Sequence, residues 1–132
     1  MRKLVQQGGF EDVGGYSRAV RLGEIIAVSG TAPTTENGVA VSDDVYVQTH
    51  DAFARALAAV AELGGSAESV IRTRTYLAPG ADWRGASEAH REIFDRLRPA
   101  NTTLFVAGFI PEGVLVEVEV DAVLENDAGS LP

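Results

Sequence analysis

The fold of this chain is decided by one stretch, Val114-Leu115-Val116-Glu117-Val118-Glu119-Val120-Asp121-Ala122-Val123. Its residues alternate in polarity, which is typical of a β-strand with one buried face. Three carboxylates, those of Glu117, Glu119 and Asp121, share the other face, about 7 Å apart at two-residue spacing. Like charges so placed repel unless cations or hydrogen-bond donors lie opposite them. We therefore expect such groups on a neighbouring strand.

Length and composition limit the possible classes of protein. The 132 residues fit one domain, 1–132, and there is no cysteine for disulfides or thiolate chemistry. Residues 1–7 lack the apolar core of a signal peptide, and no apolar run approaches the roughly 18 residues of a membrane span. We therefore expect a cytoplasmic protein without a membrane partner. Nineteen acidic and eleven basic residues give a charge of −8, which disfavours nucleic acid as a partner.

The hydrophobic pattern predicts six strands and two helices. The predicted strands cover 4–9, the two arms of a hairpin over 16–31 with its turn at 23–24, 70–77, part of 98–106, and 114–123. A loop is predicted for 32–44, and helices for 45–63 and from Asp82 to about Leu97.

The faces of these elements predict an α+β sandwich. Arg72, Arg74 and Tyr76 share one face of the strand 70–77, so the two arginines are candidates to face the carboxylates. The inner stripe of the second helix is expected to contain Trp83, Ala86, Ala89, His90, Ile93 and Phe94. Both helices would cover one face of a mixed six-stranded sheet. The other face is too apolar to be left in water and too charged for a monomer's core, which predicts an oligomer.

Motifs for common chemistries are absent. The sequence has no Walker phosphate loop, no His-Glu-x-x-His and no Gly-x-Ser-x-Gly. His50 and His90 belong to different predicted helices, without an acidic ligand at metal spacing, so we expect no metal. His90 is interpreted as a packing residue and His50 as a solvated one. Ser29 ends a predicted strand, but no histidine is placed by sequence to activate it.

Five blocks in order resemble the RidA/YjgF family of reactive-intermediate deaminases. They are 15–20 (Gly-Tyr-Ser-Arg-Ala-Val), 28–30 (Val-Ser-Gly), 70–77, 98–100 (Arg-Pro-Ala) and 116–123. The resemblance covers nearly the whole chain and implies a single RidA-like domain with a chorismate-mutase-like fold. It also implies a homotrimer in which three sheets form a central barrel, with small-molecule clefts between subunits. Active members hydrolyse an enamine or imine to a 2-keto acid and ammonia, without metal or cofactor.

The family's functional residues match this chain in part. Its water-positioning glutamate falls on Glu117, its cleft tyrosine on Tyr16, and its Ser-Gly strand end on Ser29 and Gly30. The arginine that binds the substrate carboxylate in active deaminases falls on Asn101, and Asn cannot supply that charge-assisted fork. This substitution puts standard 2-iminoacid deaminase activity in doubt.

Two further family positions also differ. An asparagine of the second helix falls on Ser87, and a glutamine of the hairpin falls on Arg18. We hypothesise that Arg18, or alternatively Arg74, supplies the missing cation. Arg18 is equally interpreted as an ion-pair partner of Glu117 or Glu119.

The resemblance favours a trimer that binds a small carbonyl, imine or amide compound and hydrolyses it with Glu117. Asn101, Thr102 and backbone N–H groups would then donate hydrogen bonds to the substrate oxygen. The alternatives are a non-catalytic binding or interaction module and the ribonuclease or translation-inhibitor activity with which some relatives are labelled. The charge of −8 counts against the ribonuclease.

Overall fold

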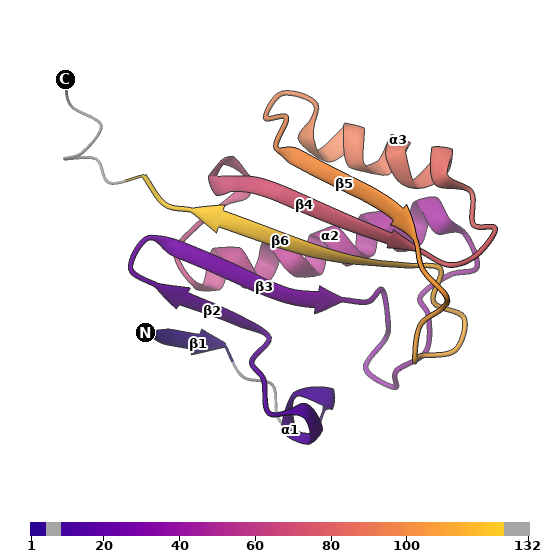
Figure 1. Cartoon of the computed structure of the whole chain (residues 1–132), viewed down its shortest axis with the longest axis horizontal. Helices are drawn as coiled ribbons and strands as arrows, with labels where there is room; N and C mark the ends of the chain where they lie inside the picture. Colours follow the sequence, from indigo (N-terminus) through magenta and orange to yellow (C-terminus); the bar gives the residue numbers. More distant parts are fainter. Residues whose placement is uncertain (5–8, 126–132) are drawn as a thin grey trace.

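The computed structural model describes residues 1–4 and 9–125. Its elements, in chain order, are β1 (Arg2–Leu4), α1 (Phe10–Gly14), β2 (Ala19–Leu22), β3 (Ile25–Thr31), α2 (Val45–Glu62), the 3₁₀ turn η1 (Ala67–Ser69), β4 (Val70–Leu77), α3 (Trp83–Phe94), β5 (Ala100–Phe105) and β6 (Val116–Val123). The strands form one mixed sheet in the order β1-β2-β3-β6-β4-β5. Helices α2 and α3 lie behind this sheet and leave its near face open (Figure 1). The predicted α+β sandwich with a mixed six-stranded sheet is confirmed.

Strand β6 lies at the centre of the sheet, and it has the one buried face that its alternation predicts. It pairs antiparallel with β3 on one side and with β4 on the other. Val116, Val118, Val120 and Ala122 are fully buried against the helices, whereas the residues between them are half-buried on the open face. Because both edges of β6 are covered, its four buried side chains lie in the middle of the core.

Both long helices begin after an acidic cap, and Asp82 is the cap that the sequence predicts. Asp44 accepts a hydrogen bond from Tyr46 N at 2.8 Å, and Asp82 accepts one from Arg84 N at 3.1 Å. Helix α2 ends at Glu62, one residue before the predicted end. Helix α3 ends at Phe94 rather than near Leu97. The chain turns after it and reaches a left-handed backbone conformation at Arg98 (φ 49°).

The prediction that Trp83 belongs to the inner stripe of α3 is wrong. Trp83 is 48% exposed, and its ring lies 4.8 Å from the guanidinium of Arg84. The buried face of α3 consists of Ala86, Ala89 and Phe94. As the first residue of the helix, Trp83 precedes the turns that pack on the sheet.

The N-terminal region differs from the prediction in two ways. The first strand ends at Leu4, and residues 5–8 of the predicted strand lie outside the described residues. A short helix, α1, follows, and its five residues are too few for a periodic pattern. The hairpin arm begins at Ala19, so Tyr16 and Arg18 lie in the connection before β2 rather than on a strand face.

The open face and the β5 edge carry exposed apolar side chains. Ile71 is 54% exposed, Phe105 51% and Leu104 41%. Strand β5 pairs with β4 as the parallel edge of the sheet and is exposed at every position. Exposed patches of this kind mark surfaces that bind other proteins. Association through this face stays a prediction.

Candidate functional site

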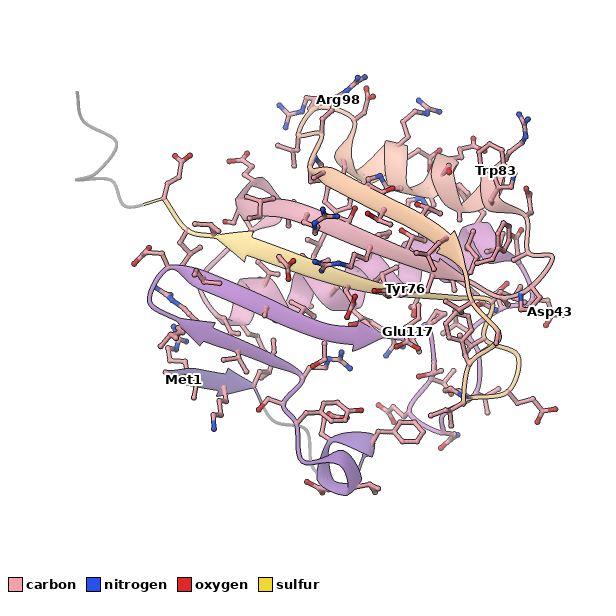
Figure 2. The ribbon with its side chains drawn as sticks, viewed as in Figure 1. Met1, Asp43, Tyr76, Trp83, Arg98 and Glu117 are labelled. Carbon is pink, nitrogen blue, oxygen red and sulfur yellow. The ribbon has the colours of Figure 1, made fainter. Side chains whose placement is uncertain are left out.

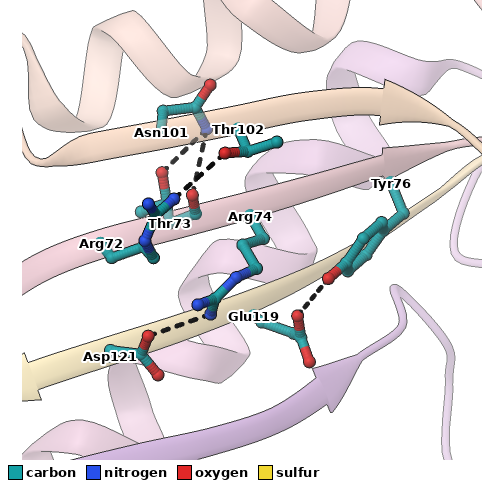
Figure 3. Close-up of polar contacts among 8 residues, drawn as sticks. All are labelled: Arg72, Thr73, Arg74, Tyr76, Asn101, Thr102, Glu119 and Asp121. Atoms are coloured by element: carbon teal, nitrogen blue, oxygen red, sulfur yellow. Dashed lines mark hydrogen bonds and ion pairs between the residues drawn. The ribbon is translucent and has the colours of Figure 1, made fainter.

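The open face carries a ladder of polar contacts between β4 and its neighbours (Figure 3). Arg74 Nη1 lies 3.0 Å from Asp121 Oδ2, and the hydroxyl of Tyr76 donates to Glu119 Oε1. Arg72 instead donates to the hydroxyl of Thr102 at 3.1 Å. The prediction that an arginine of β4 faces the carboxylates is therefore confirmed for Arg74, but Arg72 bonds to β5.

The register of β4 and β6 leaves one carboxylate without a partner. Arg74 lies directly opposite Glu119, and Tyr76 opposite Glu117, but each bonds to the carboxylate two residues further along β6. Within the described residues, Glu117 makes neither a hydrogen bond nor an ion pair. A carboxylate held in this way is available to a ligand.

The side chain of Glu117 lies over the backbone of Gly30 at the end of β3. A Cβ at position 30 would overlap Oε1 of Glu117, so this close approach requires glycine. Figure 2 shows Glu117 near this end of β3, with Tyr76 close by. Burial raises the pKa of Glu117, although the nearby positive charge of Arg18 opposes that shift. A raised pKa suits a group that accepts a proton near neutral pH.

Arg18 holds the strand end on which Glu117 rests. Its Nη2 donates to Ser29 O at 2.7 Å, to Gly30 O at 2.6 Å and to Thr31 Oγ1 at 2.9 Å. Burial lowers the pKa of Arg18, and the negative charge of Glu11 is the largest effect in the opposite direction. In the part of the chain that the structure describes, Arg18 forms no ion pair within 4.0 Å with Glu117. Its guanidinium therefore supports the backbone beside Glu117.

Two buried polar atoms near this group have no hydrogen-bond partner in residues 1–4 and 9–125. They are Nε of Arg18 and Oε1 of Glu11, which is only 6% exposed. Tyr16 borders the same region, with its backbone N–H bonded to Glu11 O at 3.1 Å and its ring packed against Gly14. Ser29 donates through Oγ to Ser17 O at 2.7 Å. The structure thus gathers Tyr16, Arg18, Ser29, Gly30 and Glu117 at the end of β3.

Asn101 belongs to a different group, on the helix side of the sheet. Its Nδ2 donates to Thr73 Oγ1 at 2.9 Å and to Thr73 O at 3.4 Å, and its Oδ1 accepts from Thr103 Oγ1 at 2.8 Å. Both amide hydrogens therefore have acceptors within the chain. Asn101 and Ser87 line one small cavity, together with Thr75, Ala86, His90 and Thr103.

The predicted site residues thus fall into two groups that one chain does not bring together. Side chains opposite each other in the register share a face, so Asn101 lies on the face of Thr73, under α3. Glu117 lies on the face of Tyr76, which is the open one. Thr102 also lies on the open face, bonded to Arg72. Asn101 and Ser87 are consequently separated by the sheet from Glu117.

The sequence-based interpretation of His90 as a packing residue is confirmed. Its ring lies 5.3 Å from Phe53 and 4.7 Å from Phe94, between centroids, and its Nε2 lies 2.8 Å from Thr73 Oγ1. Burial lowers its pKa. However, His90 also lines the cavity beside Asn101, which sequence reasoning did not predict.

Threonines on β4 and β5 were missed as members of this cavity. Thr73 and Thr75 alternate with Arg72, Arg74 and Tyr76 along β4, so they point towards the helices, and Thr75 lines the cavity together with Thr103 of β5. The sequence signal that could have identified them is a pair of polar residues at two-residue spacing on the strand face that is predicted to pack against the helices. No group of three or more metal-ligating side chains occurs among the described residues, and none of their helices could span a membrane.

Comparison with known proteins defines the class. The family model described as Endoribonuclease L-PSP matches residues 9–124. An uncharacterized protein of Streptomyces coelicolor is 44% identical over 121 residues, covering 91% of this chain and 90% of that protein. The chain belongs to this family, and a similar solved structure is of a YjgF/YER057c/UK114 family member.

Two further proteins are similar to the chain. The crystal structure of a YjgF/YER057c/UK114 family member from Mycobacterium tuberculosis has a TM-score of 0.84 and 35% identity, covering 93% of this chain and 98% of that one. The chloroplastic Reactive Intermediate Deaminase A of Arabidopsis thaliana is 29% identical over 113 residues, covering 85% of this chain and 60% of that protein.

Proposed function

We propose that this protein is a homotrimer that binds a small metabolite in clefts between subunits and hydrolyses a C=N bond in it. Water adds to the carbon of an imine, and collapse of the adduct releases ammonia and leaves a carbonyl. A related enamine enters the same reaction after a proton moves to its carbon. The observation that carries the proposal is the half-buried carboxylate of Glu117, which lies over Gly30 and has no partner among the described residues.

Glu117 has the properties that this reaction needs. Its carboxylate is not neutralised by an ion pair within the described residues, and burial raises its pKa, so it can accept a proton from the attacking water. It can return that proton to the leaving nitrogen. Arg18 secures the carbonyls of Ser29 and Gly30 beneath it and limits movement of the strand end.

The separation of the two groups of residues supports the proposed cleft between subunits. Asn101 and Ser87 lie on the helix side near the β5 edge, whereas Glu117 and Tyr16 lie at the end of β3. They can contact one ligand if the β5 edge of one copy lies beside the β3 end of another. The exposed Leu104 and Phe105 on β5 support such an arrangement.

A non-catalytic binding module is the alternative that one observation favours. The amide of Asn101 is committed to Thr73 and cannot replace a carboxylate-binding arginine. Such a protein would bind its ligand saturably without turnover. The ribonuclease suggested by the family description has less support, because the charge of −8 disfavours binding to RNA.

Ammonia release from enzymatically generated 2-aminoacrylate tests the proposal. The native chain, Asn101→Arg and Glu117→Gln are compared after sedimentation has shown that each is a trimer. We expect release by the native chain or by Asn101→Arg, and loss of about 100-fold or more when Glu117→Gln is added to the active form. Activity in neither form, together with saturable ligand binding, would instead favour the binding module.

The assembly has its own test. Ile71→Asp places a charge on the open face, so it is expected to convert a trimer into monomers in sedimentation experiments. Val47→Asp, at an exposed position of α2 on the other side of the sheet, is the matched control and should remain trimeric. A monomeric native chain would contradict the intersubunit cleft.

A further inference from the structure

The cavity between α3 and the β4–β5 edge contains an unused hydrogen-bonding group. Its volume is about 70 Å³, and its lining includes Ser87, His90 and Thr75. Thr75 is 2% exposed, and its Oγ1 has no hydrogen-bond partner among the described residues. A buried hydroxyl is rarely left without a hydrogen bond. A ligand group that bonds to it would replace the hydrogen bonds to water that it loses on folding. The volume suits one functional group rather than a whole metabolite.

A directed chain of hydrogen bonds favours one neutral tautomer of His90. Asn101 Oδ1 accepts a hydrogen bond from Thr103, and Asn101 Nδ2 donates one to Thr73 Oγ1. Nδ2 also donates to the carbonyl of Thr73, which can only accept, so the amide nitrogen must be on the side of Thr73. The hydroxyl of Thr73 has one hydrogen, which it can direct to His90 Nε2 at 2.8 Å. The remaining ring hydrogen then lies on Nδ1, for which the described residues supply no acceptor. In this tautomer His90, which lines the cavity, is a neutral donor.

The cavity has no charge with which to balance an anion. None of its six lining residues is an acid, a lysine or an arginine, and burial lowers the pKa of His90. The two arginines of β4 are on the opposite face, where Arg72 bonds to Thr102 and Arg74 to Asp121. A carboxylate that entered here would lose water without gaining a cation, which is unfavourable.

We propose that this cavity binds an uncharged polar group of the ligand, a carboxamide or a hydroxyl, through His90, Ser87 and Thr75, and that it rejects a carboxylate. This names the ligand class of the site in the proposed function and therefore rests on it. A carboxamide fits the donors and acceptors well. Its oxygen accepts from His90 Nδ1, while its amino group donates to the hydroxyl oxygens of Ser87 and Thr75.

The test compares two probes that differ in this one group, pyruvamide and pyruvate. The full native chain is titrated with each at neutral pH, and the backbone amide signals of Ser87, Asn101 and Thr103 are followed by NMR. We expect pyruvamide to shift these signals saturably and to bind at least about tenfold more tightly than pyruvate, as one net hydrogen bond or more predicts. Equal or tighter binding of pyruvate, or no shift with either probe, overturns the proposal.

Two variants localise the effect. His90→Phe keeps an aromatic ring between Phe53 and Phe94 but removes the donor, and it should weaken pyruvamide binding roughly tenfold. His50→Phe, on the outer side of α2, is the matched control and should leave binding unchanged. If His90→Phe does not fold, Ser87→Ala gives the same test at an exposed position. Full pyruvamide affinity in the folded variant overturns the proposal.

These outcomes are distinct from failure of the proposed function. If pyruvamide binds selectively but no imine substrate is turned over, the ligand class stands and the hydrolysis falls. If the native chain rapidly deaminates 2-aminoacrylate, which carries a carboxylate, the hydrolysis stands and the selectivity proposed here falls.

Discussion

Gly30 lies so close beneath the carboxylate of Glu117 that a single added Cβ would overlap Oε1. The backbone of β3 therefore helps to set the position of the group proposed to act on water. Gly30→Ala is expected to reduce turnover by about 10- to 100-fold, because small displacements of a catalytic group are costly. Its effect on stability should be small, since the end of the Glu117 side chain can move away.

A double-mutant cycle separates this effect from a general change in the backbone. In a Glu117→Ala background the overlap no longer exists, so Gly30→Ala should have no further effect on the residual rate or on the unfolding midpoint. Full additivity of the two substitutions would show that Gly30 acts independently of Glu117.

Burial of Glu117 also predicts how stability depends on pH. Because the folded pKa lies above the unfolded one, the folded state holds more protons between the two values, and stability falls as pH rises through that window. Glu117→Gln removes the buried charge and should be more stable than the native chain at neutral pH. Urea unfolding at several pH values checks this, and the gain should disappear below the ordinary pKa of a carboxyl group.

A surface link between α2 and α3 should respond to pH in the opposite direction. Glu92 Oε1 accepts from the hydroxyl of Tyr46 at 2.5 Å and lies 2.7 Å from His50 Nε2. These two hydrogen bonds lower the pKa of Glu92. Their contribution is present above the unfolded pKa and is lost as pH falls through the folded one. Glu92→Gln should therefore lower the unfolding midpoint at neutral pH but hardly at acidic pH, whereas a constant difference would exclude this linkage.

Gln48 fixes the loop before β6 to α2. It is fully buried, donates to Ser42 O at 2.6 Å and to Gly113 O at 2.9 Å, and accepts from Leu115 N at 2.7 Å. Gln48→Leu leaves these backbone groups without partners and should cost about 2–4 kcal/mol in urea unfolding. Thr49→Val is the control: it removes one bond within the helix, to Val45 O, and should cost about 1 kcal/mol or less.

Arg18 is expected mainly to stabilise the end of β3 through its hydrogen bonds. Arg18→Gln cannot reproduce the three bonds from Nη2 and should lower the free energy of unfolding by about 2 kcal/mol. If Arg18 also supplies the cation that Asn101 lacks, this variant will lose affinity for pyruvate while it remains a trimer. Unchanged affinity for pyruvate would exclude that second role.

The sequence predicts the sheet well because its signals are local. Alternation along 114–123 identifies β6 and its buried face, the helical period of 45–63 identifies α2, and Asp82 identifies the start of α3. Short or irregular segments have no such signal. Helix α1 has five residues, and the backbone near Tyr16 and Arg18 is set by contacts with β3 rather than by its own pattern.

The candidate site is less predictable because it depends on the register between paired strands and on which face of the sheet each side chain occupies. Sequence spacing shows that Arg74 can reach a carboxylate, but not that it bonds to Asp121 and leaves Glu117 free. Spacing along β5 likewise does not show that the amide of Asn101 is committed to Thr73. Such facts come from the pairing of strands far apart in the chain.

The central position of β6 has a consequence for how the protein folds during synthesis. Strands β1–β3 and the pair β4–β5 do not pair with each other, because β6 lies between them. The ribosome makes β6 after all five other strands, so the emerging chain holds two half-sheets whose inner edges stay uncovered until residues 116–123 have left the exit tunnel. Uncovered strand edges pair readily with other chains. Nascent chains that stall before β6 should therefore depend on chaperones far more than chains that have passed it.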